Sequence, residues 1–238
     1  MPRLPIWAAI AETLTNEIRQ KHYRPGDKLP TEAELAGRFG VNRHTVRHAL
    51  SGLAEAGLVH SRRGAGVFVA ARPTEYPLGR RVRFHANVIA AGQTPSRRIT
   101  RSETRPADTE EARLLELGVG AALHVVEGVS MADGQPIAAF RSLFPAERVP
   151  GLPEALTATG SITAALERCG VADYTRRETR LTAQLADPVL ALTLQLRPGA
   201  AVLRTVAVNV DTRGRVVEQG TTWFAGERVT LTVAGDQD

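Results

Sequence analysis

Two clusters of basic and hydroxyl side chains near the start of the chain have the chemistry of a surface that contacts nucleic acid. The clusters are Arg43, His44, Thr45 and Arg47, and then Arg62, Arg63 and Gly64. Guanidinium, imidazole and hydroxyl groups donate hydrogen bonds to phosphates, and arginine also donates to both acceptors on the major-groove edge of guanine. A solvated basic surface is the alternative that charge alone leaves open.

The positive charge of the chain is concentrated in the segment that carries these clusters. Residues 1–75 contain eleven Lys and Arg against seven Asp and Glu, whereas the remainder contains nineteen against eighteen, from totals of 30 and 25. A length of 238 residues with 43% hydrophobic content allows two domains with separate cores. We therefore expect one domain that binds a polyanion and one that does not.

The elements that hold the first cluster can be predicted from capping chemistry. Three helices are predicted, over residues 6–22, 31–39 and 42–57. Thr31 and Glu34 match a capping box at the start of the second helix. Gly40 stands where a helix end needs a left-handed residue, and Asn42 is suited to cap the third helix. Two helices joined by such a tight turn form a helix-turn-helix.

The third helix has one apolar face and one exposed basic face. Its apolar face carries Val46, Ala49, Leu50 and Leu53. After this helix, residues 58–61 and 67–69 predict the strands of a hairpin whose turn is basic and rich in glycine. These elements together predict a winged helix-turn-helix over residues 1–70, in which the first turn of the third helix and the wing contact double-stranded DNA.

A different pattern follows a short segment with two prolines. We predict a linker at residues 71–78 and a second domain at 79–238. Strands are predicted near 97–105, 121–132, 136–144, 174–185, 201–212 and 216–232, the last broken near Gly226, and helices near 82–92, 109–117, 161–169 and 187–195. Turns at Asp133-Gly134 and Arg213-Gly214 favour antiparallel pairing. The expected fold class is α+β with a mainly antiparallel sheet.

Two stretches of the second domain resemble each other. Residues 114–144 and 192–224 each contain a helix end, a strand that follows a glycine, a hairpin and a second strand. The two are offset by 79 residues before the hairpin and by 80 after it. This similarity predicts an internally duplicated sheet with a pocket between its halves, and chance similarity of two hairpins is the alternative.

Polar residues in apolar surroundings are candidates for a ligand site. Arg141 lies in an otherwise apolar strand, and Ser161 stands at the predicted start of a helix, where an anion could bind. Arg180 is a weaker candidate, because strand alternation could direct it outward. A rim ion pair for Arg141 and simple capping for Ser161 are the structural alternatives.

The composition also argues against several classes of protein. A single cysteine, Cys169, allows no disulfide framework within the chain and no cysteine-rich metal site. No apolar run approaches the length of a membrane span, and no signal peptide is recognisable. We expect a cytoplasmic protein without metal, cofactor or membrane association.

The N-terminal motifs resemble those of the GntR family of regulators. The similarity rests on three stretches: Pro25-Gly-Asp-Lys-Leu-Pro-Thr-Glu-Ala-Glu-Leu-Ala, Gly40-Val-Asn-Arg-His-Thr-Val-Arg and Gly57-Leu-Val. The resemblance implies operator contacts from the start of the third helix and the wing. With the two basic clusters, the candidate DNA-contacting residues are Thr31, Arg43, His44, Thr45, Arg47, Arg62, Arg63 and Gly64.

The second domain resembles the UTRA ligand-sensing domain of the HutC branch of that family, which shares its fold with chorismate lyase. Segments such as Arg72-Pro-Thr-Glu-Tyr-Pro-Leu and Tyr174-Thr-Arg-Arg-Glu-Thr-Arg-Leu-Thr-Ala are similar to the phosphonate-gene regulators of this branch. The resemblance implies ligand contacts at Arg83, Phe84, Arg141, Ser161 and Glu218. Arg83 and His85 replace hydroxyl residues of many relatives, which favours a small and more anionic ligand.

We therefore expect a homodimeric DNA-binding repressor that reads a two-fold operator and responds to a small anionic effector such as a phosphonate, phosphate or phosphorylated metabolite. The alternatives are a regulator of another pathway that senses a sugar phosphate or organic acid, a DNA-binding protein without ligand, and a chorismate-lyase-like enzyme domain fused to a DNA-binding domain. The last alternative lacks a recognisable nucleophile and base.

Overall fold

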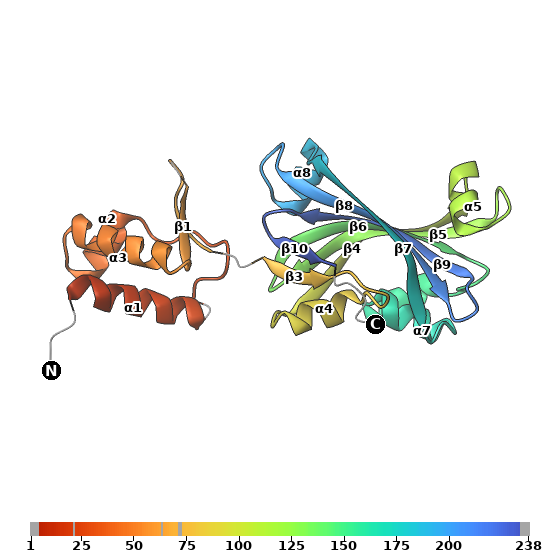
Figure 1. Ribbon diagram of the computed structural model, residues 1–238, viewed down its shortest axis with the longest axis horizontal. Coiled ribbons are helices and arrows are strands. Elements are labelled where there is room, and N and C mark those ends of the chain that lie inside the picture. Colours follow the sequence, from red (N-terminus) through yellow and green to blue (C-terminus); the bar gives the residue numbers. More distant parts are fainter. Residues whose placement is uncertain (1–4, 21, 63, 71–72, 234–238) are drawn as a thin grey trace. The chain divides into compact units, whose positions relative to one another are not determined.

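The computed structural model describes residues 5–20, 22–62, 64–70 and 73–233. The chain divides into two compact units, Met1–Arg72 and Pro73–Asp238 (Figure 1). Each unit is considered by itself.

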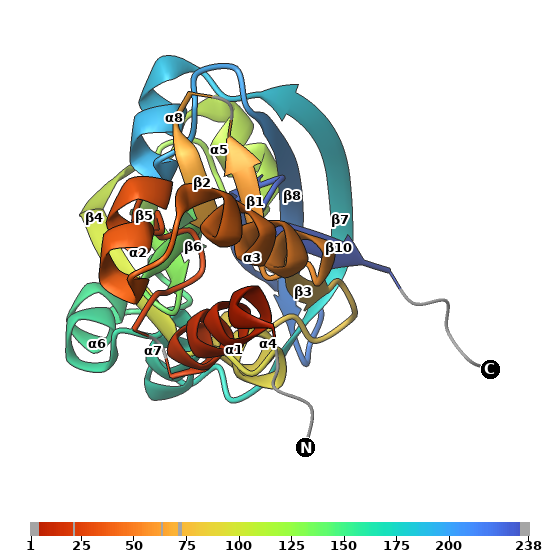
Figure 2. The same ribbon diagram turned by 90° about the vertical axis from the view of Figure 1, so that its left-hand side faces the viewer.

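The first unit is the predicted winged helix-turn-helix. It contains α1 (Ile6–Arg19), α2 (Glu32–Phe39), α3 (Arg43–Glu55), β1 (Val59–Arg62) and β2 (Gly66–Val69). The capping box of Thr31 and Glu34, the left-handed Gly40 (φ 64°) and the Asn42 cap are all present, so local chemistry sets both ends of the turn. α3 packs against α1 and β1 (Figure 2), and its four predicted apolar residues are buried. α1 ends at Arg19, short of the predicted residue 22.

The second unit is built on one antiparallel sheet of six strands. In spatial order these are β4 (Pro95–Pro106), β5 (Ala122–Ala132), β6 (Gln135–Pro145), β9 (Val216–Ala225), β8 (Ala201–Asp211) and β7 (Tyr174–Leu185). On one side lie α4 (Phe84–Ala90), α6 (Leu152–Thr159) and α7 (Ile162–Arg168), and on the other lie α5 (Thr109–Leu115) and α8 (Pro188–Leu194) (Figure 1). The predicted α+β class is confirmed.

The sheet contains the predicted duplication. The order β4, α5, β5, β6 recurs as β7, α8, β8, β9, and the first residues of β4, α5 and β5 are each 79 positions before their counterparts. Each half contributes three strands, and the halves join where β6 pairs with β9, from Ala138 to Leu143. The structure therefore has an approximate two-fold relation that passes between Arg141 and Thr221, which pair at the centre of this seam.

Two features differ from the sequence-based expectations, and one expected irregularity is confirmed. Residues 74–77, expected within the linker, form β3 (Thr74–Pro77), which pairs in parallel with β10 (Val229–Thr232). The break expected near Gly226 is real, since β9 ends at Ala225 and β10 begins at Val229. α6 was not predicted. Its eight residues provide only two buried apolar side chains, which is too short a pattern to recognise.

Candidate functional site

The first turn of α3 presents its polar side chains to solvent. Arg43 and His44 are exposed, whereas the Thr45 hydroxyl is 2.9 Å from Oδ1 of Asn42, to which it donates. The same Asn42 oxygen accepts from the Thr45 amide at 2.8 Å. The helix start is thus capped locally, and Arg43 and His44 have the exposure that contacts with DNA need.

Arg47 is held by an acidic residue of the preceding helix. Its Nε and Nη2 donate to Oε1 and Oε2 of Glu32 at 3.0 and 2.7 Å, and 64% of the arginine side chain remains exposed. The hydrogen bond from Arg47 lowers the pKa of Glu32. This two-point contact orients the guanidinium group while leaving it accessible.

The remaining DNA-contact candidates lie at the start of α2 and in the wing. The Thr31 hydroxyl accepts from the Glu34 backbone amide at 3.3 Å and donates to Glu34 Oε2 at 2.7 Å, so Thr31 acts as a helix cap in this structure. In the wing, Arg62 ends β1, and Gly64 adopts a positive φ of 74° that suits a tight turn. Arg63 lies outside the described residues.

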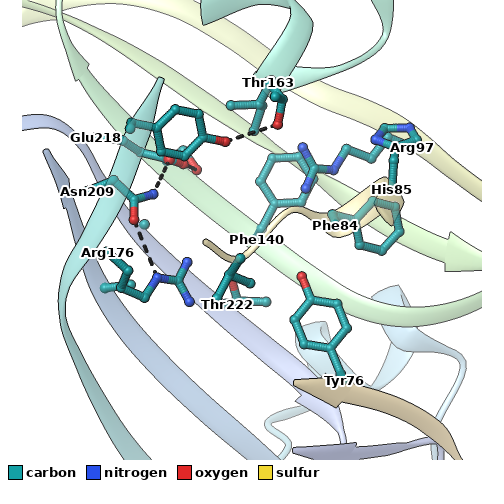
Figure 3. A pocket seen from close by; sticks show the side chains of 16 residues that line it. Tyr76, Phe84, His85, Arg97, Phe140, Thr163, Arg176, Asn209, Glu218 and Thr222 are labelled. Carbon is teal, nitrogen blue, oxygen red and sulfur yellow. Dashed lines mark hydrogen bonds between the residues drawn. The ribbon is translucent and has the colours of Figure 1, made fainter. Parts of the chain in front are cut away.

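A polar cavity of about 70 Å³ lies on the side of the sheet that faces α4 and α7 (Figure 3). Its polar lining consists of Tyr76, His85, Arg97, Ser142, Thr163, Tyr174, Arg176, Asn209, Glu218 and Thr222. These residues come from both halves of the sheet and from the elements that cover it. The pocket expected between the halves is therefore present.

Two half-buried arginines enter this cavity from equivalent positions in the two halves. Arg97 on β4 and Arg176 on β7 are separated by 79 residues, the offset of the duplication. Nε of Arg97 contacts Oγ of Ser130 at 3.3 Å, and Nε of Arg176 contacts Oδ1 of Asn209 at 3.4 Å. Ser130 and Asn209 are likewise 79 residues apart, so the two halves use the same anchoring contact.

Neither of these arginines has a carboxylate within 4.0 Å in the part of the chain that the structure describes. Burial lowers the pKa of both guanidinium groups, although arginine stays protonated in proteins. The Arg97 group also lies 4.8 Å from the ring centre of Phe84 and 4.7 Å from that of Phe140. Two half-buried cations with free Nη donors form a strong site for an oxyanion.

One buried carboxylate, Glu218, also lines the cavity. Its Oε1 accepts from the Ser142 hydroxyl and its Oε2 from the Asn209 amide, both at 2.7 Å. Asn209 therefore connects Arg176 and Glu218 without direct contact between the two charges (Figure 3). Two donors per carboxylate leave lone pairs for a further donor.

The candidate effector residues divide into two groups by location. Phe84, His85 and Glu218 line the cavity. Arg83 lies beside it: Nη2 donates to the Tyr174 carbonyl at 2.7 Å, and the guanidinium stacks 3.5 Å from the centre of the Tyr174 ring. Arg83 therefore positions a cavity residue.

Three candidates do not line this cavity. Arg141 is on the opposite face of the sheet, because its neighbours Phe140 and Ser142 point into the cavity, and it pairs instead with Glu111 at 3.2 Å. Arg180 is 77% exposed and pairs with Glu178. Ser161 caps α7 by accepting from the Ala164 amide at 3.4 Å. The structure contains the ion pair and the helix cap that were weighed as alternatives for Arg141 and Ser161, and Arg141 also lines a second pocket on its own face of the sheet, together with Glu127 and Trp223.

Sequence reasoning missed both cavity arginines. Alternation along a single strand could not show which side of the sheet the pocket occupies. The 79-residue offset was the available signal, because it relates Arg97 to Arg176.

Among the described residues, no group of three or more His, Cys, Asp or Glu is placed to hold a metal ion. No described helix has the length and apolar character needed to span a bilayer.

Family models match both units of the chain. Residues 7–69 match the model of the bacterial regulatory proteins of the GntR family, and residues 90–230 match the UTRA domain. The chain belongs to the GntR family of transcription regulators, with a UTRA domain as its second unit. It is therefore a DNA-binding regulator and not an enzyme.

Individual relatives extend this conclusion over nearly the whole chain. The transcriptional regulator RB1450 of Rhizobium meliloti is 36% identical over 229 residues, which cover 96% of this chain and 94% of that protein. The probable transcriptional regulator PhnF of Escherichia coli is 40% identical over 134 residues, 56% of this chain and 49% of that one. The crystal structure of PhnF from Mycobacterium smegmatis aligns with a TM-score of 0.68 at 27% identity, over 98% and 100% of the two chains.

Proposed function

We propose that the protein is a homodimeric repressor whose affinity for a two-fold operator changes when a small anionic effector, a phosphonate or phosphate compound, occupies the cavity of the UTRA domain. The observation that carries the proposal is the pair Arg97 and Arg176, half-buried cations without a carboxylate partner in the described structure. The motifs similar to phosphonate-gene regulators and the relatives named as repressors support the same function.

On the DNA side, Arg43, His44 and Arg47 supply exposed donors to base edges and phosphates. Arg62, Arg63 and Gly64 supply wing contacts to the backbone or minor groove. Thr45 and Thr31 are the remaining candidates, and their hydroxyls are already engaged: Thr31 caps α2, and Thr45 donates to the Asn42 side chain that caps α3.

On the effector side, the proposed contacts are Arg97 and Arg176, with Phe84, His85 and Glu218 around them. Binding that favours one arrangement of the dimer would change operator affinity through the difference in effector affinity between two states. A coupling free energy of about 1 to 3 kcal/mol is sufficient for such a switch.

Fluorescence anisotropy of the full chain on labelled DNA from upstream of its own gene tests the proposal. Ethylphosphonate, 2-aminoethylphosphonate and inorganic phosphate are added in turn, and we expect at least one to shift the operator Kd by roughly fivefold or more. Arg176→Ala should abolish that shift. Arg180→Ala is the matched control, because it removes an exposed arginine of the same strand and should preserve the shift.

Failure of the wild-type chain to bind this DNA at moderate salt would contradict the repressor assignment. Operator binding that ignores every phosphonate and phosphate would contradict the effector class. A response to sugar phosphates or organic acids alone would assign the regulator to another pathway.

A further inference from the structure

Three charged side chains line one small cavity without neutralising each other. Arg97, Arg176 and Glu218 all contribute to its lining, yet no arginine nitrogen lies within 4.0 Å of the Glu218 carboxylate in the described part of the chain. Burying charges separately costs far more than burying them as a pair. Because the fold keeps these charges apart, a ligand in the cavity can provide the counter-charges that neutralise them.

The arrangement of these charges is symmetric for the cations and asymmetric for the acid. Arg97 and Arg176 are equivalent by the duplication, with equivalent anchors. The counterpart of Glu218, 80 positions earlier, is the buried Ala138. A carboxylate therefore stands in one half of the site only, which gives the cavity a cationic part and a single anionic end.

Among the described residues, Glu218 receives side-chain hydrogen bonds only from neutral groups. The Ser142 hydroxyl and the Asn209 amide each occupy one of its oxygens, and the backbone at Gly220 lies beside it, where a Cβ would be 3.5 Å from Oε1. Two donors fix the orientation of the carboxylate and leave acceptor capacity toward the cavity.

A ligand with negative charge only would be opposed by Glu218, because repulsion between like charges is stronger at a buried carboxylate than in bulk water. A ligand with an oxyanion at one end and a cation at the other would satisfy both parts of the site. The cavity of about 70 Å³ limits the separation between the two groups to a short chain.

We infer that the effector is a compact zwitterion, in which a phosphonate or phosphate group binds between Arg97 and Arg176 and an ammonium group donates to Glu218. This inference rests on the proposed function and narrows its effector class. Phosphonates and phosphate monoesters present the same oxyanion, so both ω-aminoalkyl forms fit the site.

Isothermal titration calorimetry of the full chain tests the inference with matched ligands. 2-Aminoethylphosphonate and O-phosphoethanolamine carry the ammonium group, ethylphosphonate lacks it, and 2-hydroxyethylphosphonate replaces it with a neutral donor. We expect at least one ammonium compound to bind roughly tenfold to a hundredfold tighter than ethylphosphonate. The ammonium compound that binds more tightly shows whether the site prefers a phosphonate or a phosphate ester.

The role of Glu218 is tested by the ratio of two affinities. Glu218→Gln should reduce the preference for 2-aminoethylphosphonate over ethylphosphonate to about one while ethylphosphonate affinity is kept or increased. The ratio is insensitive to partial loss of folded protein. Thermal melting checks that the variant is folded. The comparison of ligands on the wild-type chain does not depend on this variant.

The outcomes separate this inference from the function on which it rests. Equal or tighter binding of ethylphosphonate, equal binding of the hydroxyl analogue, or a preference that survives in Glu218→Gln would overturn the zwitterion and leave an anion sensor. Absence of binding by all four compounds would overturn both, since the arginine pair would then hold neither a phosphonate nor a phosphate ester.

Discussion

Glu32 holds Arg47 in place for the DNA contact that we propose for this arginine. The ion pair fixes a guanidinium group that would otherwise lose rotamer freedom on binding, and the group stays 64% exposed at the surface of α3. Arginine is the side chain best suited to two-point contacts with guanine. Arg47 is therefore the residue of α3 from which we expect the largest contribution to base preference.

Arg47→Ala should reduce discrimination between the operator and a scrambled duplex by about 1 to 3 kcal/mol, because a two-point base contact is lost. Anisotropy titrations on both duplexes at one salt concentration measure the ratio. Arg38→Ala is the control, since Arg38 lies at the end of α2 and pairs with Glu17. Unchanged discrimination in Arg47→Ala would place base recognition elsewhere on α3 or in the wing.

The elements that were predicted correctly are those whose signals are local. Capping residues and left-handed glycines set α2 and α3, and the two hairpin turns set the pairs β5–β6 and β8–β9. β3 was missed because its partner, β10, lies far away in sequence, and parallel pairing leaves no turn to recognise. The sequence also did not show which face of β6 lines the cavity, because most residues around Arg141 are apolar on both faces of the strand.

At the level of strands, the approach of β4, β5 and β6 depends on Gly128. A Cβ at this position would lie 2.5 Å from the Arg98 carbonyl oxygen and 2.9 Å from Cζ of Phe140. Phe140 in turn stacks against the Arg97 guanidinium in the cavity. The backbone of β4 and a side chain of the proposed effector site therefore share the space that this glycine leaves.

Gly128→Ala should destabilise the UTRA domain by about 1 to 3 kcal/mol through overpacking. It should also weaken effector binding, because Phe140 must move. Thermal melting and calorimetry with 2-aminoethylphosphonate measure the two effects. Gly118→Ala is the matched control, as a Cβ there meets no atom within 4 Å, and equal behaviour of the two variants would contradict the expectation.

The stability of the whole molecule should depend on pH through buried histidine. Burial lowers the pKa of His124 below its ordinary 6.5, so the folded state favours the neutral ring. As the pH falls below about 6.5, the unfolded chain takes up a proton that the folded chain resists, and stability is lost. His85 changes in the same direction, through burial and the neighbouring Arg97.

The melting temperature should therefore be lower at about pH 5.5 than at about pH 7.5, and His124→Gln should reduce that difference. Differential scanning fluorimetry in matched buffers measures it. His44→Gln, at an exposed position of α3, should leave the difference as in the wild type. A larger difference in His124→Gln would mean that the sign of the effect is wrong.

A dimer on a two-fold operator has a strict spacing requirement, because half-sites one helical turn of DNA apart face the same side. Insertion of about five base pairs between the half-sites rotates one by half a turn and should reduce affinity sharply, whereas about ten should restore part of it. Light scattering should give twice the 25.6 kDa chain mass. Affinity that is indifferent to spacing would indicate independent monomers.

The positions of Arg97 and Arg176 have a mechanical consequence. β4 and β7 are the two outermost strands of the six-stranded sheet, and no strand pairing joins them. An effector that forms hydrogen bonds with both arginines would connect the two edge strands of this open sheet. Its occupancy would then restrain the twist of the whole sheet, because the two edge strands could no longer move independently of each other.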